Sequence, residues 1–170
     1  MRWMILLALL LPATTSAQTV AANPWTRGTT LEAFLGTATA PRTMDSYGGA
    51  VGWELTRRFE IQGLAAWFPR KGSDEFAADL KLLMNLTQPS TLVPYVAGGA
   101  GLYQGAFERA HAKTDPTAVV GAGAHLYLRR HLSIRPEGTL RFVIDRSKTH
   151  WVATITLAVT YHFEEHGGME

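Results

Sequence analysis

Hydrophobic and polar residues alternate with a period of two along most of this chain. Residues 77–86 give the clearest example, because every second position from Ala78 to Leu86 is apolar while Asp79 and Lys81 lie between them. Four more segments alternate in the same way: residues 47–56, 120–128, 131–143 and 150–163. This period is typical of β-strands that have one apolar face.

Three further segments, residues 29–39, 59–68 and 93–103, are rich in strand-forming residues but do not keep one clear alternation. We expect a β-bulge or a glycine-rich tight position to shift the phase midway through these segments. The total is then eight strands of about ten residues, the length that a tilted β-strand needs to cross a bilayer.

The connections between the expected strands are of two kinds. Arg57–Arg58 and Arg129–Arg130 are very tight turns, and residues 87–92 form a short one. The alternate connections are expected to be longer: residues 41–45, 69–75, 104–116 and 144–149. Short turns at one end and longer loops at the other are typical of an up-and-down membrane barrel. The fold predicted is an all-β, eight-stranded antiparallel up-and-down transmembrane β-barrel.

Alternation alone does not decide which face lies inside. A soluble periplasmic lipocalin-like barrel that binds an apolar ligand would have the same period with its apolar face inward. The face opposite the apolar one is poor in charge and rich in Gly, Ala and Thr, which favours a membrane barrel over a water-exposed wall. Aromatic residues near the strand ends are also expected to form interfacial girdles. These are Trp53, Phe59, Trp67, Phe142, Trp151, Tyr161 and Phe163.

The first 17 residues have the pattern of a secretory signal peptide. Arg2 is followed by nine apolar residues, and small residues precede the expected cleavage after Ala17. Nine apolar residues are too few to span the roughly 30 Å hydrocarbon core as a helix. We therefore expect a barrel domain at residues 18–163, a tail at residues 164–170, and export across the inner membrane.

Composition narrows the class of protein further. The chain has 170 residues, no cysteine and 18% charged residues, below the roughly 25% usual for soluble domains. Disordered, collagen-like and disulfide-rich classes are excluded by these figures. A formal net charge of +2 gives no argument for nucleic-acid binding, and the six histidines lack metal-ligand spacing, so no cofactor is expected.

Three stretches have a distinctive strand pattern: residues 94–103 (PYVAGGAGLY), residues 121–128 (GAGAHLYL) and residues 132–138 (LSIRPEG). They resemble the fifth, sixth and seventh strands of the outer-membrane β-barrel family of OmpA- and OmpX-like eight-stranded proteins. Residues 156–163 resemble the aromatic terminal signal read by the barrel-insertion machinery. The resemblance covers residues 25–163 and includes no periplasmic domain.

The resemblance implies a small, non-enzymatic protein of the bacterial outer membrane, expected to be a monomer. Its role would be structural or in surface interaction, with at most a narrow, gated ion path. Its expected partners are outer-membrane lipid, lipopolysaccharide and, during biogenesis, the insertion machinery.

With the polar face inward, seven charged residues become candidates for a network in the lumen. They are Glu54, Glu60, Asp79, Lys81, Arg135, Glu137 and Arg141. Charges inside a narrow barrel must pair or stay hydrated, because an isolated buried charge is very costly. The network can either plug the interior or rearrange to open a path for small ions.

An enzymatic function is a possible alternative, because the lipid A deacylases and acyltransferases also have eight-stranded barrels. His131 and Ser133 share one strand face with Glu137 further along, as a Ser-His-acid set requires. However, His131 adjoins a turn on the expected periplasmic side, and the surrounding residues do not match those enzymes. No catalytic residue is therefore assigned.

Overall fold

The computed structural model describes residues 28–40, 42–70, 74–87, 90–105, 113–145 and 148–164. The predicted signal peptide lies outside these residues, as does all of the predicted tail except Glu164, the last residue of the final strand.

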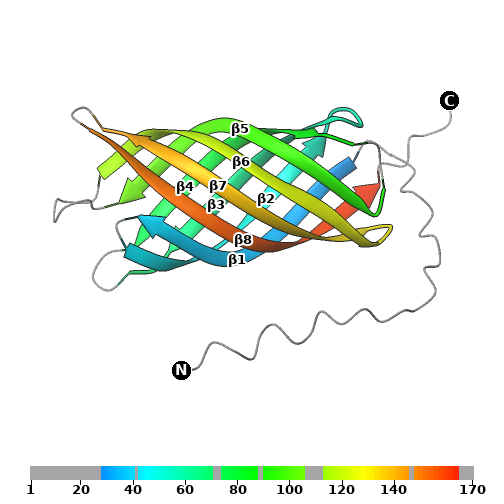
Figure 1. Cartoon of the computed structure of the whole chain (residues 1–170), viewed down its shortest axis with the longest axis horizontal. Coiled ribbons are helices and arrows are strands. Elements are labelled where there is room, and N and C mark those ends of the chain that lie inside the picture. Colours follow the sequence, from blue (N-terminus) through cyan, green and yellow to red (C-terminus); the bar gives the residue numbers. More distant parts are fainter. Residues whose placement is uncertain are drawn as a thin grey trace, which may run out of the picture.

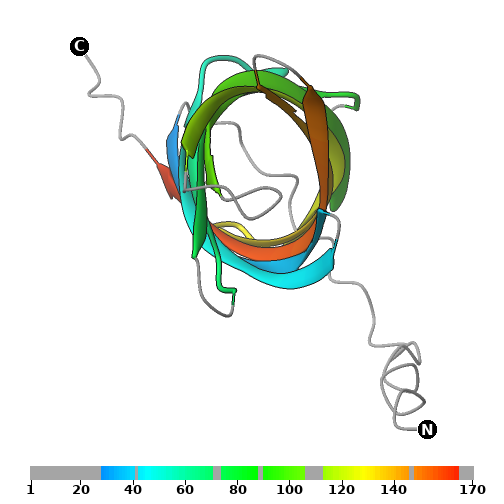
Figure 2. The same ribbon diagram turned by 90° about the vertical axis from the view of Figure 1, so that its left-hand side faces the viewer.

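Eight antiparallel strands close into one barrel in sequence order, with each strand paired to the next and β1 paired to β8. Their bounds are β1 Gly28–Ala40, β2 Arg42–Glu54, β3 Phe59–Phe68, β4 Glu75–Asn85, β5 Leu92–Gly105, β6 Lys113–Arg129, β7 Leu132–Ile144 and β8 Thr149–Glu164. Figure 1 shows the strands inclined to the long axis, and Figure 2 shows the closed ring. The predicted fold class is confirmed. The described residues contain no helix long and apolar enough to cross a membrane.

The two ends of the barrel differ. One end, here the short-turn end, carries the turns at residues 55–58, 86–91 and 130–131. The other, here the loop end, carries the connections at residues 69–74, 106–112 and 145–148. The first connection does not fit the prediction of a loop at residues 41–45. Ala40 pairs directly with Arg42, so β1 and β2 are joined through residue 41 alone.

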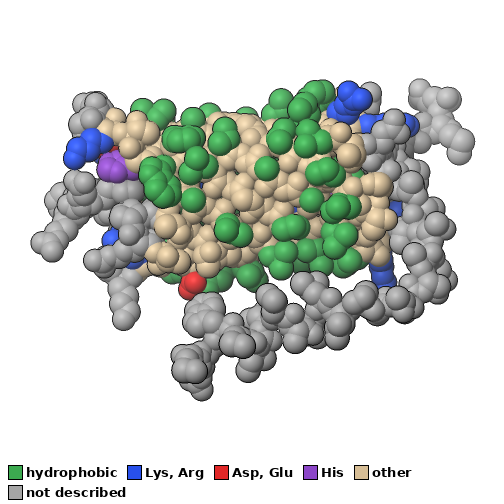
Figure 3. Space-filling model, viewed as in Figure 1, with side chains coloured by type: hydrophobic (Ala, Val, Ile, Leu, Met, Phe, Trp, Pro, Cys, Tyr) green, Lys and Arg blue, Asp and Glu red, His purple; other side chains and the backbone are tan. Residues whose placement is uncertain are grey.

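Side chains alternate between an apolar outer face and a largely polar interior. In β4, Leu80 and Leu82 are exposed on the outside, whereas Asp79 and Lys81 are buried inside. Hydrophobic side chains cover the wall shown in Figure 3, and the lysine and arginine side chains visible there lie toward its ends. This polarity is the reverse of what a soluble barrel with an apolar interior requires.

The prediction of a phase shift in three strands is wrong. β1, β3 and β5 each keep a single alternation, with Phe34, Phe68 and Tyr95 facing inward. These buried aromatic residues made the inner face look apolar in the sequence. The register shift between paired strands lies elsewhere, at Tyr127 and Arg129 in the β6–β7 ladder.

Two consecutive glycines in β5, Gly98 and Gly99, differ in the space available for a side chain. A Cβ on Gly99 would lie 2.1 Å from the backbone oxygen of Leu80 and 2.8 Å from the Cα of Lys81, its partner on β4. A Cβ on Gly98 would meet only the Val119 oxygen, at 4.0 Å. Gly99 therefore permits a close approach of backbones beside the buried Lys81.

We expect Gly99→Ala to destabilise the barrel by about 1–3 kcal/mol, because the added methyl group meets backbone atoms that cannot move aside. Urea unfolding in detergent micelles, followed by tryptophan fluorescence, measures the change. Gly98→Ala is the matched control and should leave the unfolding midpoint nearly unchanged. Equal midpoints for the two variants would contradict this account of Gly99.

Candidate functional site in the barrel interior

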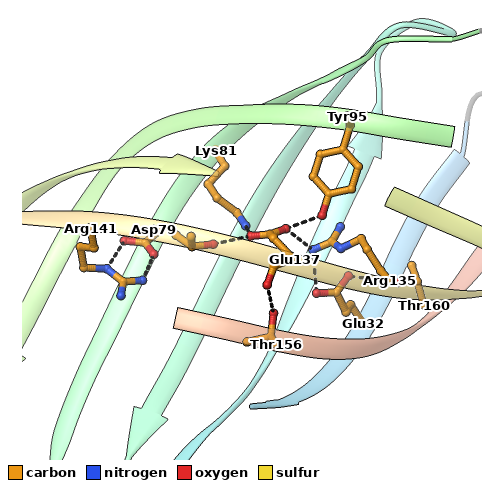
Figure 4. Close-up of polar contacts among 10 residues, drawn as sticks. Glu32, Asp79, Lys81, Tyr95, Arg135, Glu137, Arg141, Thr156 and Thr160 are labelled. Atoms are coloured by element: carbon orange, nitrogen blue, oxygen red, sulfur yellow. Dashed lines mark hydrogen bonds and ion pairs between the residues drawn. The ribbon is translucent and has the colours of Figure 1, made fainter. Parts of the chain in front are cut away.

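Six buried charged side chains form the central network of the lumen (Figure 4). Its members come from β1, β4 and β7: Glu32, Asp79, Lys81, Arg135, Glu137 and Arg141. Three cations and three carboxylates balance to zero formal charge when all six are ionised. Neutrality within the network lets the charges lie away from bulk water without a net buried charge.

Glu137 is the most connected member. Its Oε1 accepts hydrogen bonds from Lys81 Nζ at 2.6 Å and from Thr139 Oγ1 at 2.8 Å. Its Oε2 accepts one from Tyr95 Oη at 2.5 Å and lies 3.4 Å from Arg135 Nη2. Both carboxylate oxygens are therefore occupied by donors, and two of these donors are cations.

Arg135 links this centre to β1 and β8. Its Nη2 donates to Glu32 Oε1 at 2.7 Å, and the other oxygen of Glu32 accepts from Thr160 Oγ1 at 3.0 Å. The guanidinium carbon lies 5.6 Å from the centre of the Tyr95 ring, within cation–π range. Arg135 is 1% exposed, and its hydrogen bond and ion pairs are all made through Nη2, whereas Nε and Nη1 are buried without a hydrogen-bond partner among the described residues.

Arg141 and Asp79 form a second pair nearer the loop end. Arg141 Nε donates to Asp79 Oδ1 at 3.4 Å, and Nη2 donates to Oδ2, so the contact is bidentate. The Arg141 guanidinium also lies 5.9 Å from the centre of the Phe68 ring. This pair is the part of the central network that adjoins the apolar layer at the loop end, through Phe68.

The buried side chains of that apolar layer come from six of the eight strands and occupy much of the lumen between the central network and the loop end. Its buried members are Phe34, Ala38, Ala66, Phe68, Ala77, Tyr103, Val143, Val152 and Ala158. Beside Phe68, Tyr103 donates its hydroxyl hydrogen to Glu75, which also pairs with Arg70 at 2.9 Å. A cavity bordered by this layer and the central network has a volume of about 20 Å³, enough for roughly one water molecule. The centre of the lumen is closed by side chains.

A third layer of polar residues lies at the short-turn end. Thr30 Oγ1 donates to Glu60 Oε1 at 3.0 Å. His162 Nε2 lies 3.0 Å from Ser133 Oγ, and its Nδ1 lies 3.5 Å from Glu54 Oε1.

Solved structures with a similar fold include several outer-membrane β-barrels. The N-terminal β-barrel domain of OprF from Pseudomonas aeruginosa is 20% identical, with a TM-score of 0.66 over 81% of this chain and 98% of that one. Neisserial surface protein A is 9% identical, with a TM-score of 0.63 over 80% and 96% of the two chains. Ail, the attachment invasion locus protein of Yersinia pestis, is 12% identical, with a TM-score of 0.56 over 81% and 99%.

The fold is that of the outer-membrane eight-stranded β-barrels. The sequence itself matches no family model and no curated protein. The likeness therefore lies in the fold rather than in a set of identical residues.

Within this outer-membrane barrel fold, all seven predicted lumen residues face inward, but they do not form one network. Asp79, Lys81, Arg135, Glu137 and Arg141 belong to the central network, whereas Glu54 and Glu60 lie in the layer at the short-turn end. Sequence reasoning missed Glu32, because the inward Phe34 obscured the phase of β1. Leu31 and Leu35 lie on the outer face, and their odd-numbered positions could have indicated that the even-numbered Glu32 faces inward.

The predicted girdle residues all lie on the outer face. Trp53, Phe59, Tyr161 and Phe163 are near the short-turn end, and Trp67, Phe142 and Trp151 are near the loop end. Phe142 is half-buried, whereas the other six predicted girdle residues are exposed. Two further exposed aromatic residues, Tyr47 and Phe76, flank Trp67 through direct cross-strand pairing.

The residues of the enzymatic alternative are not brought together as a Ser-His-acid set. Ser133 contacts His162, not His131, and Glu137 is occupied by Lys81, Tyr95 and Arg135. Ser133 is 0% exposed, so a substrate has no access to its hydroxyl. The described residues also contain no group of three or more His, Asp or Glu side chains placed to hold a metal ion.

We expect Lys81→Met to lower the free energy of unfolding by about 3–5 kcal/mol, because it leaves Glu137 buried without its closest cation. Adding Glu137→Gln to the same chain should cost less than the sum of the two single substitutions. Urea titration in micelles measures all three variants. Lys113→Met removes the two ion pairs that an exposed lysine makes with Asp115 and Asp145 at the loop end, and it should change stability far less. Additive effects of the two lumen substitutions would contradict the coupling.

Proposed function

We propose that this protein is a monomeric, non-enzymatic barrel of the bacterial outer membrane, with a lumen closed at rest by the central network. The observation that carries the proposal is the inverted polarity of the barrel. Six charged side chains are buried inside, while leucine, isoleucine and tryptophan side chains are exposed on the outer wall. Such an exterior is stable where hydrocarbon, rather than water, is the surrounding solvent.

The outer aromatic residues support a defined position in the bilayer. Two bands separate along the barrel, one near each end, as expected where aromatic rings lie at the two membrane interfaces. We assign the short-turn end to the periplasm and the loop end to the cell surface, in keeping with the short periplasmic turns of such barrels. Export would depend on the predicted signal peptide.

The lumen supports a structural role with at most a gated ion path. Lys81, Arg135 and Arg141 each contact a carboxylate across the interior, and the cavity among them accommodates about one water. Ions would pass only if Glu137 exchanged its partners and moved side chains out of the path.

The loop end supports a role in surface interaction. Arg70, Lys113 and Lys148 bring cations to this rim, where the phosphate groups of lipopolysaccharide would be accessible to them. At the opposite end, Tyr161 and Phe163 close β8 on the outer face, and we propose that the insertion machinery recognises this terminal strand.

Membrane insertion is tested by fractionation and electrophoresis. We expect the full chain, expressed in a Gram-negative host, to partition into the outer-membrane fraction and to require detergent for extraction. Boiling should shift its mobility on a denaturing gel, because the closed hydrogen-bonded barrel resists detergent until heated. Recovery in the detergent-free periplasmic fraction would overturn the proposal in favour of a soluble barrel.

Closure of the lumen is tested by planar-bilayer recording. We expect low and infrequent conductance from the native chain and larger, longer openings from Lys81→Ala/Glu137→Ala, which removes two central side chains while keeping charge balance. Lys113→Ala is the control, because Lys113 lies at the rim. Unchanged conductance in the double variant, with heat-modifiable folding retained, would show that the central network does not close the path.

A further inference from the structure

The polar layer at the short-turn end of the lumen carries negative charge that no lysine or arginine balances. Glu54 on β2 and Glu60 on β3 are direct cross-strand partners, and both side chains face the lumen. Glu60 is 4% exposed, and the side chain of Glu54 is 9% exposed. Among the described residues, Glu54 has an ion pair only with His162, and Glu60 accepts a hydrogen bond from Thr30 without an ion pair.

The other carboxylates of the lumen have their own cations. The three cations of the central network balance its three carboxylates. At the loop end, Glu75 pairs with Arg70, and Asp115 pairs with Lys113. With histidine neutral, the described residues of the central network and the short-turn layer together have a formal charge of −2. That charge comes from the two glutamates of the short-turn layer.

The basic rim at the short-turn end does not cancel this charge. Four exposed arginines lie at the tight turns, at residues 57–58 and 129–130. Dissolved salt screens such exposed charges over about 10 Å at 0.1 M. Glu54 and Glu60 instead lie inside the wall, where an ion in the lumen has to pass close to them. Because charged side chains that line the narrow part of a pore select ions of opposite sign, this lumen favours cations over anions.

Two neutral side chains in the same part of the lumen have polar atoms without a partner. Gln62 is the next inward residue after Glu60 on β3 and is 0% exposed, and neither its Oε1 nor its Nε2 has a hydrogen-bond partner among the described residues. His125 on β6 is 2% exposed, its Nδ1 is unpartnered in the same sense, and its ring lies 6.2 Å from that of His162. Buried polar atoms without a partner are costly, so contact with a partly hydrated cation would stabilise them.

We propose that current through this lumen is carried by cations, and that Glu54 and Glu60 select them at the periplasmic mouth. A cation that enters from the short-turn end meets these two carboxylates before it reaches the central network, whereas an anion is repelled by both. Gln62, which pairs with Lys81 on β4, offers a neutral oxygen ligand between the two layers. The inference rests on the proposed gated ion path and adds the class of ion and the residues that select it.

Reversal potentials across planar bilayers test this selectivity. The full-length Lys81→Ala/Glu137→Ala variant supplies the open path, and a KCl gradient is applied at pH 8, where histidine is ordinarily neutral. Even at the dielectric constant of water, one unit charge about 4 Å from the path favours a cation over an anion by roughly tenfold. We therefore expect K⁺ to permeate roughly tenfold better than Cl⁻. Adding Glu54→Gln and Glu60→Gln should bring the permeability ratio close to one.

Asp145→Asn in the same background is the matched control. It also removes a carboxylate, but from the exposed loop end, where Asp145 pairs with Lys113, and it should leave the permeability ratio nearly unchanged. Glu54→Gln alone keeps the buried hydrogen bond between Thr30 and Glu60 and should give an intermediate ratio. Heat-modifiable migration of each variant on a denaturing gel separates a lost charge from a misfolded chain.

The outcomes separate this inference from the proposed function. Equal permeability to K⁺ and Cl⁻ in the open variant, or a preference for Cl⁻, would overturn the inference and leave the gated path intact. A cation preference that persists without both glutamates would assign selection to other residues and also overturn it. A folded Lys81→Ala/Glu137→Ala barrel that passes no current would overturn the gated path and the inference together.

Discussion

The closed hydrogen-bond ladder is the constraint on which the rest of this structure depends. Pairing of β1 with β8 leaves no free sheet edge, so the backbone groups of every strand are satisfied within the wall. Once the wall is closed, the period of two divides the side chains strictly between an outside and an inside. Charges and large apolar residues are thereby separated by one layer of backbone, and the polarity of the whole molecule follows.

Inside the wall, the stability of the central network depends on pairing each buried carboxylate with a nearby cation. Glu137 and Glu32 each lie against Arg135, and Glu137 also accepts from Lys81, so both of these carboxylates are paired with cations at short range. The closeness of β4 and β5 at Gly99 leaves backbone, not a side chain, beside Lys81. Packing and electrostatics are therefore coupled in the same few residues, and the same arrangement that stabilises the lumen also closes it.

The sequence predicted the fold class correctly because alternation in β4, β7 and β8 is strict and the strands are joined in order. It was less informative where the interior is apolar: Phe34 and Phe68 face inward, so the pattern in β1 and β3 did not separate the two faces. Glu32 was missed for that reason. The loop expected at residues 41–45 was also wrong, since residues 42–45 belong to β2 and pair with β1.

Pairing within the central network could not be predicted from the sequence, because it depends on which side chains meet across the lumen. Asp79 and Arg141 are 62 residues apart, and Glu32 and Arg135 are 103 apart. Such contacts follow from barrel diameter and strand tilt, neither of which is set by any local motif.

The six residues of the central network lie on only three of the eight strands, and this gives one strand a special role. Glu32 on β1 and Asp79 on β4 both have their guanidinium partners on β7, 103 and 62 residues further along the chain. Without β7, the network would keep only Glu32, Asp79 and Lys81, with a formal charge of −1 and neither arginine. Charge compensation in the lumen therefore depends on a single strand of the wall.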